Sequence, residues 1–265
     1  MEEIIMPNRE YRAAEGISRS ELFKIKKSPL HFKYALEHPS EPTAALTFGQ
    51  AAHKYILEPY TFLDGFAVLP DLDRRTMAGK EAYSDFVMAN AGKTIIAKDD
   101  MKTIYDMKAM VDQNETARRL LQGKPERTFF WTDEPTGERC KCRPDCLTEY
   151  DGKKYIVDYK TTDSCEDGHF ERSCRKYGYQ FQAGMYTEGV FNNTLEEWGF
   201  AFVAQEKAPP YAVRVYFCSS DFVAEGIDQF RELIGIYHDC KVTGNWYGYE
   251  GPMDMPSELV GEDEA

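Results

Sequence analysis

Two acidic residues and a lysine in the middle of the chain are spaced so that they can act together. Asp158 and Lys160 lie within residues 153–161, which have the composition of a β-strand. Because side chains alternate between the two faces of a strand, both are expected on one face. Asp145 is expected in the preceding strand, over residues 138–150. The turn residues 151–153 predict a tight hairpin that places it beside Asp158.

This juxtaposition predicts a divalent metal site. Two carboxylates that share one point with an ammonium group are costly unless they hold a cation. Carboxylate oxygens are the ligands that Mg²⁺ and Mn²⁺ prefer. The main-chain carbonyl of Tyr159, the residue after Asp158, is expected to complete the shell from between the two acids. A metal held there would polarise a scissile phosphate and activate a water molecule, while Lys160 orients that water or stabilises charge at phosphorus.

Two predicted helices carry further side chains that suit such a site. Residues 46–57 contain small residues that allow close packing, and His53 lies one turn after Gly49. A single histidine in a helix is more often structural than a ligand, and both interpretations stay open at this point. In the helix over residues 177–191, Gln182 and Tyr186 share one face, where they either pack internally or point at the site.

Two features beside the motif also have competing interpretations. Glu126 precedes the first strand of this region and either points at the metal site or is solvated. A cluster of three cysteines does not have the spacing of a zinc knuckle and is expected on one face of the strand over 138–150, opposite Asp145. We interpret these residues as small apolar side chains packed against a helix: Cys140, Cys142 and Cys146.

The remaining pattern predicts an α/β (α+β) domain whose central sheet contains a three-stranded antiparallel meander flanked by helices. The meander covers residues 127–161, and a strand pair is expected over 198–205 and 211–218. Further helices and three irregular stretches complete the pattern, and Ser220 or Asp221 is expected to cap the last helix. The helices are expected at 18–26, 30–37, 76–90, 98–121 and 222–241, and the irregular stretches at 1–16, 58–75 and 163–176.

Length and composition restrict the class of protein. The 265 residues, 42% of them hydrophobic, suffice for one large domain over residues 1–250, followed by an acidic tail over 251–265 that is expected to be disordered. We find no apolar run of the length that crosses a membrane and no signal peptide, so we expect a cytoplasmic protein without a membrane partner. The seven cysteines, an odd number, are expected to be reduced.

The net charge of −13 argues against nucleic-acid binding, because such binding depends on neutralising phosphates. The charge is uneven, however, since residues 17–36 carry five basic side chains and a single acidic one. These basic side chains surround two predicted helices and either form a solvated face or contact phosphate. A bound metal ion would also invert the local field of an acidic site, so the net charge does not exclude DNA.

The motifs together resemble those of PD-(D/E)XK nucleases. Arg143-Pro144-Asp145 followed by Asp158-Tyr159-Lys160-Thr161-Thr162 resembles the signature of that superfamily. The G-x3-H pattern that ends at His53 and the Q-x3-Y pattern from Gln182 to Tyr186 are similar to those of its RecB-like branch. Residues 16–22 and 28–32 closely resemble the RecE-like exonucleases, known from the catalytic domain of exonuclease VIII, and the resemblance runs over residues 10–245.

That resemblance implies a PD-(D/E)XK, restriction-endonuclease-like core and a Mg²⁺-dependent exonuclease in which Mn²⁺ can substitute. Members degrade the 5′-ended strand of linear double-stranded DNA processively. They leave 3′ overhangs for a single-strand annealing protein of the RecT type in phage or prophage recombination. They also form toroidal homo-oligomers, so the implied partners are DNA ends, an annealing protein and further copies of the chain.

The resemblance also implies roles for individual residues. The implied catalytic set is Asp145, Asp158, Lys160, Gln182 and Tyr186. The implied metal ligands are His53, Asp145, Asp158 and the main-chain carbonyl of Tyr159, with Glu126 as a further candidate. Position 158 holds aspartate where many relatives have glutamate, which would shift the metal slightly. A cationic pocket for a 5′-phosphate is expected from Arg12, Arg19 or Lys24.

Two alternatives remain. A RecB-like single-strand DNA nuclease of the CRISPR-adaptation type holds an iron–sulfur cluster with one upstream cysteine and three near the C-terminus. Here only Cys218 and Cys240 come late in the chain, and no cysteine precedes Cys140. The other alternative is a phage accessory protein that binds DNA on a degenerate nuclease scaffold, against which the intact acidic pair and lysine argue.

Overall fold

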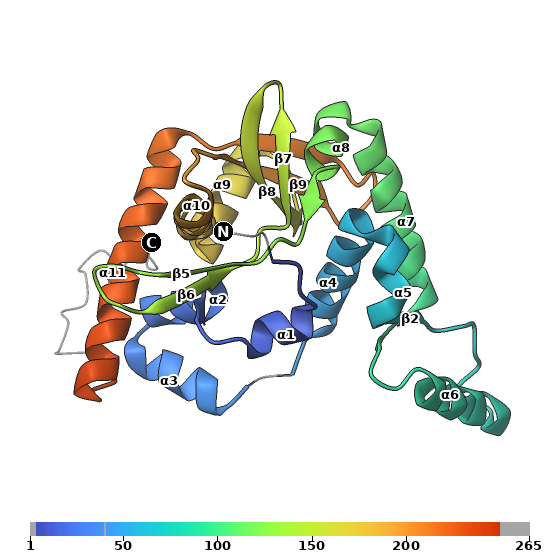
Figure 1. The fold of residues 1–265 in the computed structure, drawn as a ribbon. Coiled ribbons are helices and arrows are strands. Elements are labelled where there is room, and N and C mark those ends of the chain that lie inside the picture. Colours follow the sequence, from blue (N-terminus) through green and yellow to red (C-terminus); the bar gives the residue numbers. More distant parts are fainter. Residues whose placement is uncertain (1–3, 40, 250–265) are drawn as a thin grey trace, which may run out of the picture.

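The computed structural model describes residues 4–39 and 41–249. Its centre is a five-stranded mixed sheet with the strand order β10-β9-β8-β7-β4 (Figure 1). Strands β8 and β9 run parallel, and the other neighbours are antiparallel. The strands are β4 (Lys124–Pro125), β7 (Cys146–Tyr150), β8 (Lys153–Thr162), β9 (Gly199–Glu206) and β10 (Val213–Phe217). The predicted acidic tail over 251–265 lies outside the described residues.

The β7–β8 hairpin forms as predicted. Tyr150 pairs with Lys153, which leaves a two-residue turn of Asp151 and Gly152, both with positive φ, 50° and 75°. This conformation matches the twist of the flanking strands. The antiparallel register continues to a pair between Cys146 and Val157, so that Asp145, one residue before β7, lies opposite Asp158.

The predicted strand over residues 138–150 is wrong, because it is two strands in two sheets. β6 (Arg139–Cys142) ends before Pro144, and only the residues after it form β7. Proline has no backbone N–H to donate to a neighbouring strand, which accounts for the break. The predicted three-stranded meander is therefore divided. β5 (Phe129–Thr132) and β6 pair antiparallel in a separate sheet, in which β1 (Ile17–Ser18) lies parallel to β6.

Helices cover both faces of the central sheet. On one face, α10 (Tyr179–Thr194) and α11 (Ser220–Thr243) belong to the core that contains Ile156 and Phe202. On the other face, α4 (Ala44–Leu57) and α8 (Glu115–Leu121) contribute to the core that contains Val157 and Val203. Successive residues of β8 and β9 thus enter opposite cores, which places the even-numbered positions of β8, 158 and 160 among them, on the side of α10.

The other elements lie at the edges of these layers. In Figure 1, α11 runs along one edge of the molecule and α7 and α8 along the other, while α6 stands apart from the sheet. These elements are α1 (Asn8–Ala13), α2 (Arg19–Leu22), η1 (Phe23–Lys26), α3 (Pro29–Glu37), η2 (Pro59–Thr61), α5 (Phe62–Gly65), β2 (Phe66–Val68), α6 (Met77–Ala89), β3 (Thr94–Ile96), α7 (Lys98–Gln113) and α9 (Asp167–Tyr177).

All three stretches predicted to be irregular contain regular structure. Residues 1–16 include α1, residues 58–75 include η2, α5 and β2, and residues 163–176 include most of α9. In α9 the buried side chains of Phe170 and Cys174 are one helical turn apart, a spacing masked by the many charged residues around them.

Side-chain caps set several helix boundaries. Ser18 and Glu21 form a capping box at the start of α2, in which the backbone N–H of Ser18 donates to the Glu21 carboxylate at 2.9 Å. The predicted helix over 98–121 is divided, because Asn114 accepts from the Ala117 N–H at 3.0 Å and starts α8. The predicted cap of α11 is wrong by one residue, since Ser219 accepts from the Phe222 N–H at 3.2 Å.

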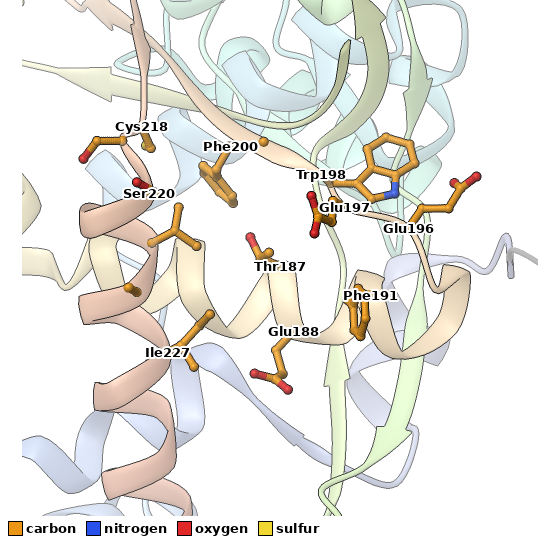
Figure 2. A pocket seen from close by; sticks show the side chains of 14 residues that line it. Thr187, Glu188, Phe191, Glu196, Glu197, Trp198, Phe200, Cys218, Ser220 and Ile227 are labelled. Carbon is orange, nitrogen blue, oxygen red and sulfur yellow. The ribbon is translucent and has the colours of Figure 1, made fainter.

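A hollow of about 470 Å³ lies between α10, α11 and the start of β9 (Figure 2). Its lining is mostly apolar, with Phe200, Val223 and Ile227 among the residues, and Glu188, Glu196 and Glu197 also line it. None of the predicted site residues lines it, so the acidic motif lies elsewhere in the fold. Among the helices of the described residues, none is both long and apolar enough to cross a membrane.

Candidate active site

Asp158 and Lys160 project from β8 toward α10, as their spacing predicts. The ammonium nitrogen of Lys160 lies 2.5 Å from Asp158 Oδ2, and Gln182 Nε2 on α10 donates a hydrogen bond to Asp158 Oδ1. Asp158 is only 1% exposed. Burial and the nearby charge of Asp145 raise its pKa to about 6, against the opposing effect of Lys160. The contacts with Lys160 and Gln182 therefore fix the orientation of the buried Asp158 carboxylate.

Asp145 sits in the bend between β6 and β7 and is fixed through both of its oxygens. The backbone N–H of Tyr159 donates to Oδ2 at 2.8 Å, and His53 Nε2 lies 2.9 Å from Oδ1. Burial raises the pKa of Asp145, but the charge and hydrogen bond of His53, the Lys160 charge and the Tyr159 N–H outweigh it. The pKa of Asp145 is thus below its ordinary value. The pKa of Asp145 is therefore lowered and that of Asp158 raised, because the two opposed carboxylates have different partners.

His53 reaches this point from α4, on the opposite face of the sheet from α10. Ala51 and Ala52 beside it are fully buried, as predicted for close packing, but a side chain at Gly49 would meet only Thr161 Oγ1, at 3.8 Å. Burial alone lowers the pKa of His53. The charge and hydrogen bond of Asp145, with the charges of Glu126 and Asp158, raise it to about 9. The imidazole is therefore protonated at neutral pH when no metal competes for its nitrogen.

Glu126 faces the site rather than the solvent. Its side chain is 17% exposed, its Oε1 lies 3.5 Å from His53 Nδ1, and its Oε2 forms an ion pair with Arg143. Burial raises its pKa. Among the described residues, His53, Glu126 and Asp145 form a group whose ligand atoms all lie within 4.8 Å of one another. Asp158 is outside that group, because its oxygens are turned to Lys160 and Gln182.

The remaining predicted residues lie on four different elements. Tyr186 is one helical turn after Gln182 on α10. Arg19, the first residue of α2, is close enough to Asp158 for that negative charge to oppose the lowering of its pKa by burial. The Arg19 guanidinium donates to the Gly178 carbonyl at 2.8 Å and lies 4.8 Å from the centre of the Phe23 ring. Arg12 and Lys24 have exposed side chains.

Three residues at the site carry roles that the sequence did not assign. Tyr179 lies below Lys160, whose Nζ is 5.0 Å from the ring centre, and Arg143 pairs with Glu126. Tyr11 on α1 covers Arg143, with its ring centre 5.7 Å from the guanidinium carbon. Tyr179 shares a helical face with Gln182, which is the sequence signal for it. The contacts of Arg143 and Tyr11 join distant segments and have no periodic pattern.

The cysteine cluster is buried but does not lie on one face as predicted. Cys140 and Cys142 belong to the core on the α10 side, whereas Cys146, beyond the break at Pro144, belongs to the core on the α4 side. All three are free thiols, and burial raises the pKa of each. Their surroundings are those of small apolar residues in a packed interior.

A comparison with models of protein families identifies the family of this chain. A model of the family described as a PDDEXK-like domain of unknown function (DUF3799) matches residues 18–256. The chain belongs to this family. The matched range contains β7, β8 and the candidate metal group of His53, Glu126 and Asp145.

A solved structure supports the fold of this DUF3799 chain. The crystal structure named "Putative exonuclease" from Eubacterium rectale is similar over 97% of this chain and 98% of its own, with 16% identity and a TM-score of 0.61. At that identity the likeness shows the fold alone. The structure of SSO0001 covers 84% of this chain and 86% of its own at 13% identity and a TM-score of 0.32, which carries no argument. No curated protein matches the sequence.

Proposed function

We propose that this protein is a metal-dependent nuclease that hydrolyses phosphodiester bonds in DNA. The observation that carries the proposal is the pair of opposed carboxylates, Asp145 and Asp158, with the ammonium group of Lys160 directly beside the second. Such a set suits the binding of a cation and a phosphate at one point. It stands in a family whose description is PDDEXK-like, the acid–acid–lysine signature.

The residues present fit a divalent metal. His53 offers an imidazole nitrogen, Asp145 and Asp158 offer hard oxygens, and Tyr159, whose main-chain carbonyl is a further oxygen donor, directly follows Asp158. We propose these four groups as ligands and Mg²⁺ as the metal, with Mn²⁺ as a substitute. The metal would supply Lewis-acid activation of the phosphate and of a water molecule.

The other side chains orient the reacting groups. Lys160 is placed to hold the attacking water or to stabilise negative charge at phosphorus. Gln182 donates to Asp158 and fixes the direction of that carboxylate. Tyr186 lies one turn after Gln182 on α10, and burial keeps its pKa far above neutral pH, so that its hydroxyl stays protonated and can donate a hydrogen bond.

The finer parts of the proposal rest on the resemblance to RecE-like exonucleases. We propose 5′-to-3′ digestion of linear double-stranded DNA, with 3′ overhangs passed to a single-strand annealing protein of the RecT type. A toroidal homo-oligomer and a cytoplasmic location belong to the same proposal. Among the three predicted phosphate-binding residues, Arg19 is favoured over Arg12 and Lys24, because its guanidinium is close enough to interact with the charge of Asp158.

The test is a linear duplex labelled in turn at each end of one strand, with closed circular DNA as the control. We expect Mg²⁺-dependent release of the 5′ label at once and of the 3′ label only late, with no cleavage of the circle. Early release of the 3′ label contradicts the polarity, and cleavage of the circle contradicts the exonuclease assignment.

Binding of Mn²⁺, used as a probe, is expected to weaken as the pH falls. Because the metal must displace the proton that His53 binds with a pKa of about 9, the affinity falls by up to about tenfold per pH unit below pH 9. Asp158, with a pKa of about 6, steepens the decline at lower pH. Calorimetry in buffers of different ionisation heat should show about one proton released per Mn²⁺ near neutral pH. Binding without proton release excludes His53 as a ligand.

The alternative iron–sulfur nuclease is not favoured. Six of the seven cysteines are buried, and they are dispersed among separate elements of the fold. In the described residues the candidate metal group contains no cysteine. Purified protein without iron would exclude this alternative, whereas a stoichiometric cluster would replace the present proposal. The non-enzymatic alternative is excluded if the Mg²⁺-dependent digestion is observed.

A further inference from the structure

We propose that Arg143 and Glu126 form a positioning pair that orients His53, and that Glu126 acts on the imidazole rather than as a ligand of the metal. The inference rests on the proposed metal-dependent nuclease function and specifies how its histidine is held. In this proposal Arg143 anchors Glu126, and Glu126 holds the histidine that binds the metal but does not bind the metal itself.

The two nitrogens of His53 face different carboxylates. Nε2 lies 2.9 Å from Asp145 Oδ1, while Nδ1 faces Glu126 Oε1 at 3.5 Å on the other side of the ring. A metal takes a single nitrogen of an imidazole. Since Asp145 and Asp158 lie opposite each other across the β7–β8 register, a cation between them meets Nε2 and leaves Nδ1–H to Glu126.

Glu126 is already fixed by groups other than a metal. Its Oε2 is paired with the guanidinium of Arg143, which is itself only 11% exposed. Its backbone adopts a left-handed conformation, φ 56°, and its N–H donates to the Asp145 carbonyl at 3.1 Å. This conformation is uncommon for a residue other than glycine and is kept where the surroundings determine it. The carboxylate is thus aimed at the ring from a fixed backbone.

The side chain of Arg143 is covered by a residue of α1. The ring of Tyr11 lies over the guanidinium, and Lys141 holds the end of α1 by donating to the Ala14 carbonyl at 2.6 Å. Arg143 Nη1 is buried and has no hydrogen-bond partner among the described residues. Arg143 is therefore turned inward toward Glu126, under α1.

The arrangement follows a general rule for metal-binding histidines. The nitrogen that does not bind the metal usually donates its N–H to a carboxylate or carbonyl, which fixes the tautomer and the ring orientation. Loss of such a partner lowers metal affinity by about 10–100-fold. Arg143 extends this chain by one step, because its ion pair with Glu126 holds that carboxylate in place.

The effect of Arg143→Met on the Mn²⁺ affinity distinguishes the two possible roles of Glu126, because the two roles predict changes of opposite sign. We expect Arg143→Met to weaken Mn²⁺ binding by about tenfold or more, because Glu126 loses its anchor and His53 its orientation. If Glu126 were a ligand restrained by Arg143, the same change would strengthen binding, because it removes a positive charge and frees a carboxylate. Isothermal titration calorimetry measures the affinity, and an unchanged or tighter dissociation constant overturns the proposal.

Two further variants keep this test specific. Arg139→Met removes an arginine of β6 that is exposed and lies over the Phe130 ring, so it alters the charge by the same amount without contacting Glu126. It should leave the Mn²⁺ affinity within about twofold of that of the unmodified protein, because surface charges are screened by salt. Arg143→Lys keeps a cation beside Glu126 and should retain most of the affinity. Equal losses in Arg139→Met and Arg143→Met would overturn the positioning role.

A spectroscopic measurement checks the same proposal without a variant of the pair. In protein saturated with Mg²⁺, long-range ¹H–¹⁵N spectra identify which nitrogen of His53 carries the proton, with His53→Gln providing the assignment. We expect the proton on Nδ1, and a proton on Nε2 would overturn the proposal. Neither readout requires hydrolysis. Failure of the unmodified protein to bind Mn²⁺ contradicts the proposed function itself, whereas binding that is insensitive to Arg143→Met contradicts only the positioning pair.

Discussion

Asp158→Asn is expected to lower Mg²⁺-dependent DNA hydrolysis by three orders of magnitude or more while leaving the protein folded. The change keeps the shape of the side chain but removes the negative charge that pairs with Lys160 and that is proposed to bind the metal. A ligand that stabilises the transition state contributes several kcal/mol, and each 1.36 kcal/mol changes a rate tenfold, so a loss on the order of 10³ follows. Initial rates on a 5′-labelled duplex under saturating Mg²⁺ measure the effect.

The same variant should be more stable than the unmodified protein when no metal is present. The pKa of Asp158 is raised in the fold to about 6 by burial and by the charge of Asp145, so the folded state binds its proton more tightly than the unfolded chain does. Its ionisation therefore removes stability as the pH rises from about 4 through 6. Asparagine has no such ionisation, so the urea midpoint of Asp158→Asn near neutral pH is expected to exceed that of the unmodified protein.

A matched control lies at the end of the same strand. Asp163 follows β8 directly, its side chain is 77% exposed, and it pairs with Lys207 at 2.7 Å. Asp163→Asn removes the same charge from the same segment and should change neither the rate nor the urea midpoint appreciably, because exposed ion pairs contribute little. Comparable rate losses in both variants would mean that general charge, and not the position of Asp158, limits hydrolysis.

The local parts of the site could be predicted from the sequence because they depend on short-range rules. Strand alternation placed Asp158 and Lys160 on one face, and a two-residue turn at Asp151 and Gly152 fixed the register that brings Asp145 opposite. Helical spacing predicts that Gln182 and Tyr186 share one face of α10, and the contact of Gln182 with Asp158 then shows that this face is turned to the site. In each case a few neighbouring residues determine the geometry, so composition and spacing are sufficient.

The errors have two different physical causes. The break at Pro144 had a local signal, since a proline inside a predicted central strand argues against that strand, and it was outweighed by the β-rich residues on either side. The contact between Arg143 and Glu126 had no such signal, because it depends on a left-handed backbone at Glu126 and on how β4 joins β7. Contacts that only the tertiary structure creates leave no period in the sequence.

Gly226→Ala, which adds one methyl group to α11, is expected to lower the free energy of unfolding. At this point α10 and α11 cross with their backbones in contact: a Cβ on Gly226 would overlap the carbonyl oxygen of Gln180, and one on Gly184 would overlap the backbone of Gly226. Backbone cannot move aside as the end of a side chain can, so the helices must separate. Overpacking of this kind costs about 3 kcal/mol, more than the roughly 1 kcal/mol that alanine gains over glycine within a helix.

The control for this change lies on the same helix. Gly235 has no atom within 4 Å of the position of a Cβ, so Gly235→Ala should raise the free energy of unfolding by roughly 0.5–1 kcal/mol through helix propensity alone. Urea unfolding of both variants gives opposite signs if the crossing is as close as described. Because Gln182 and Tyr186 lie on α10, the loss at position 226 should also lower the rate of hydrolysis. A Gly226→Ala protein as stable and as active as the unmodified one would mean that α10 and α11 do not meet there, and that the α10 side of the site is held by other contacts.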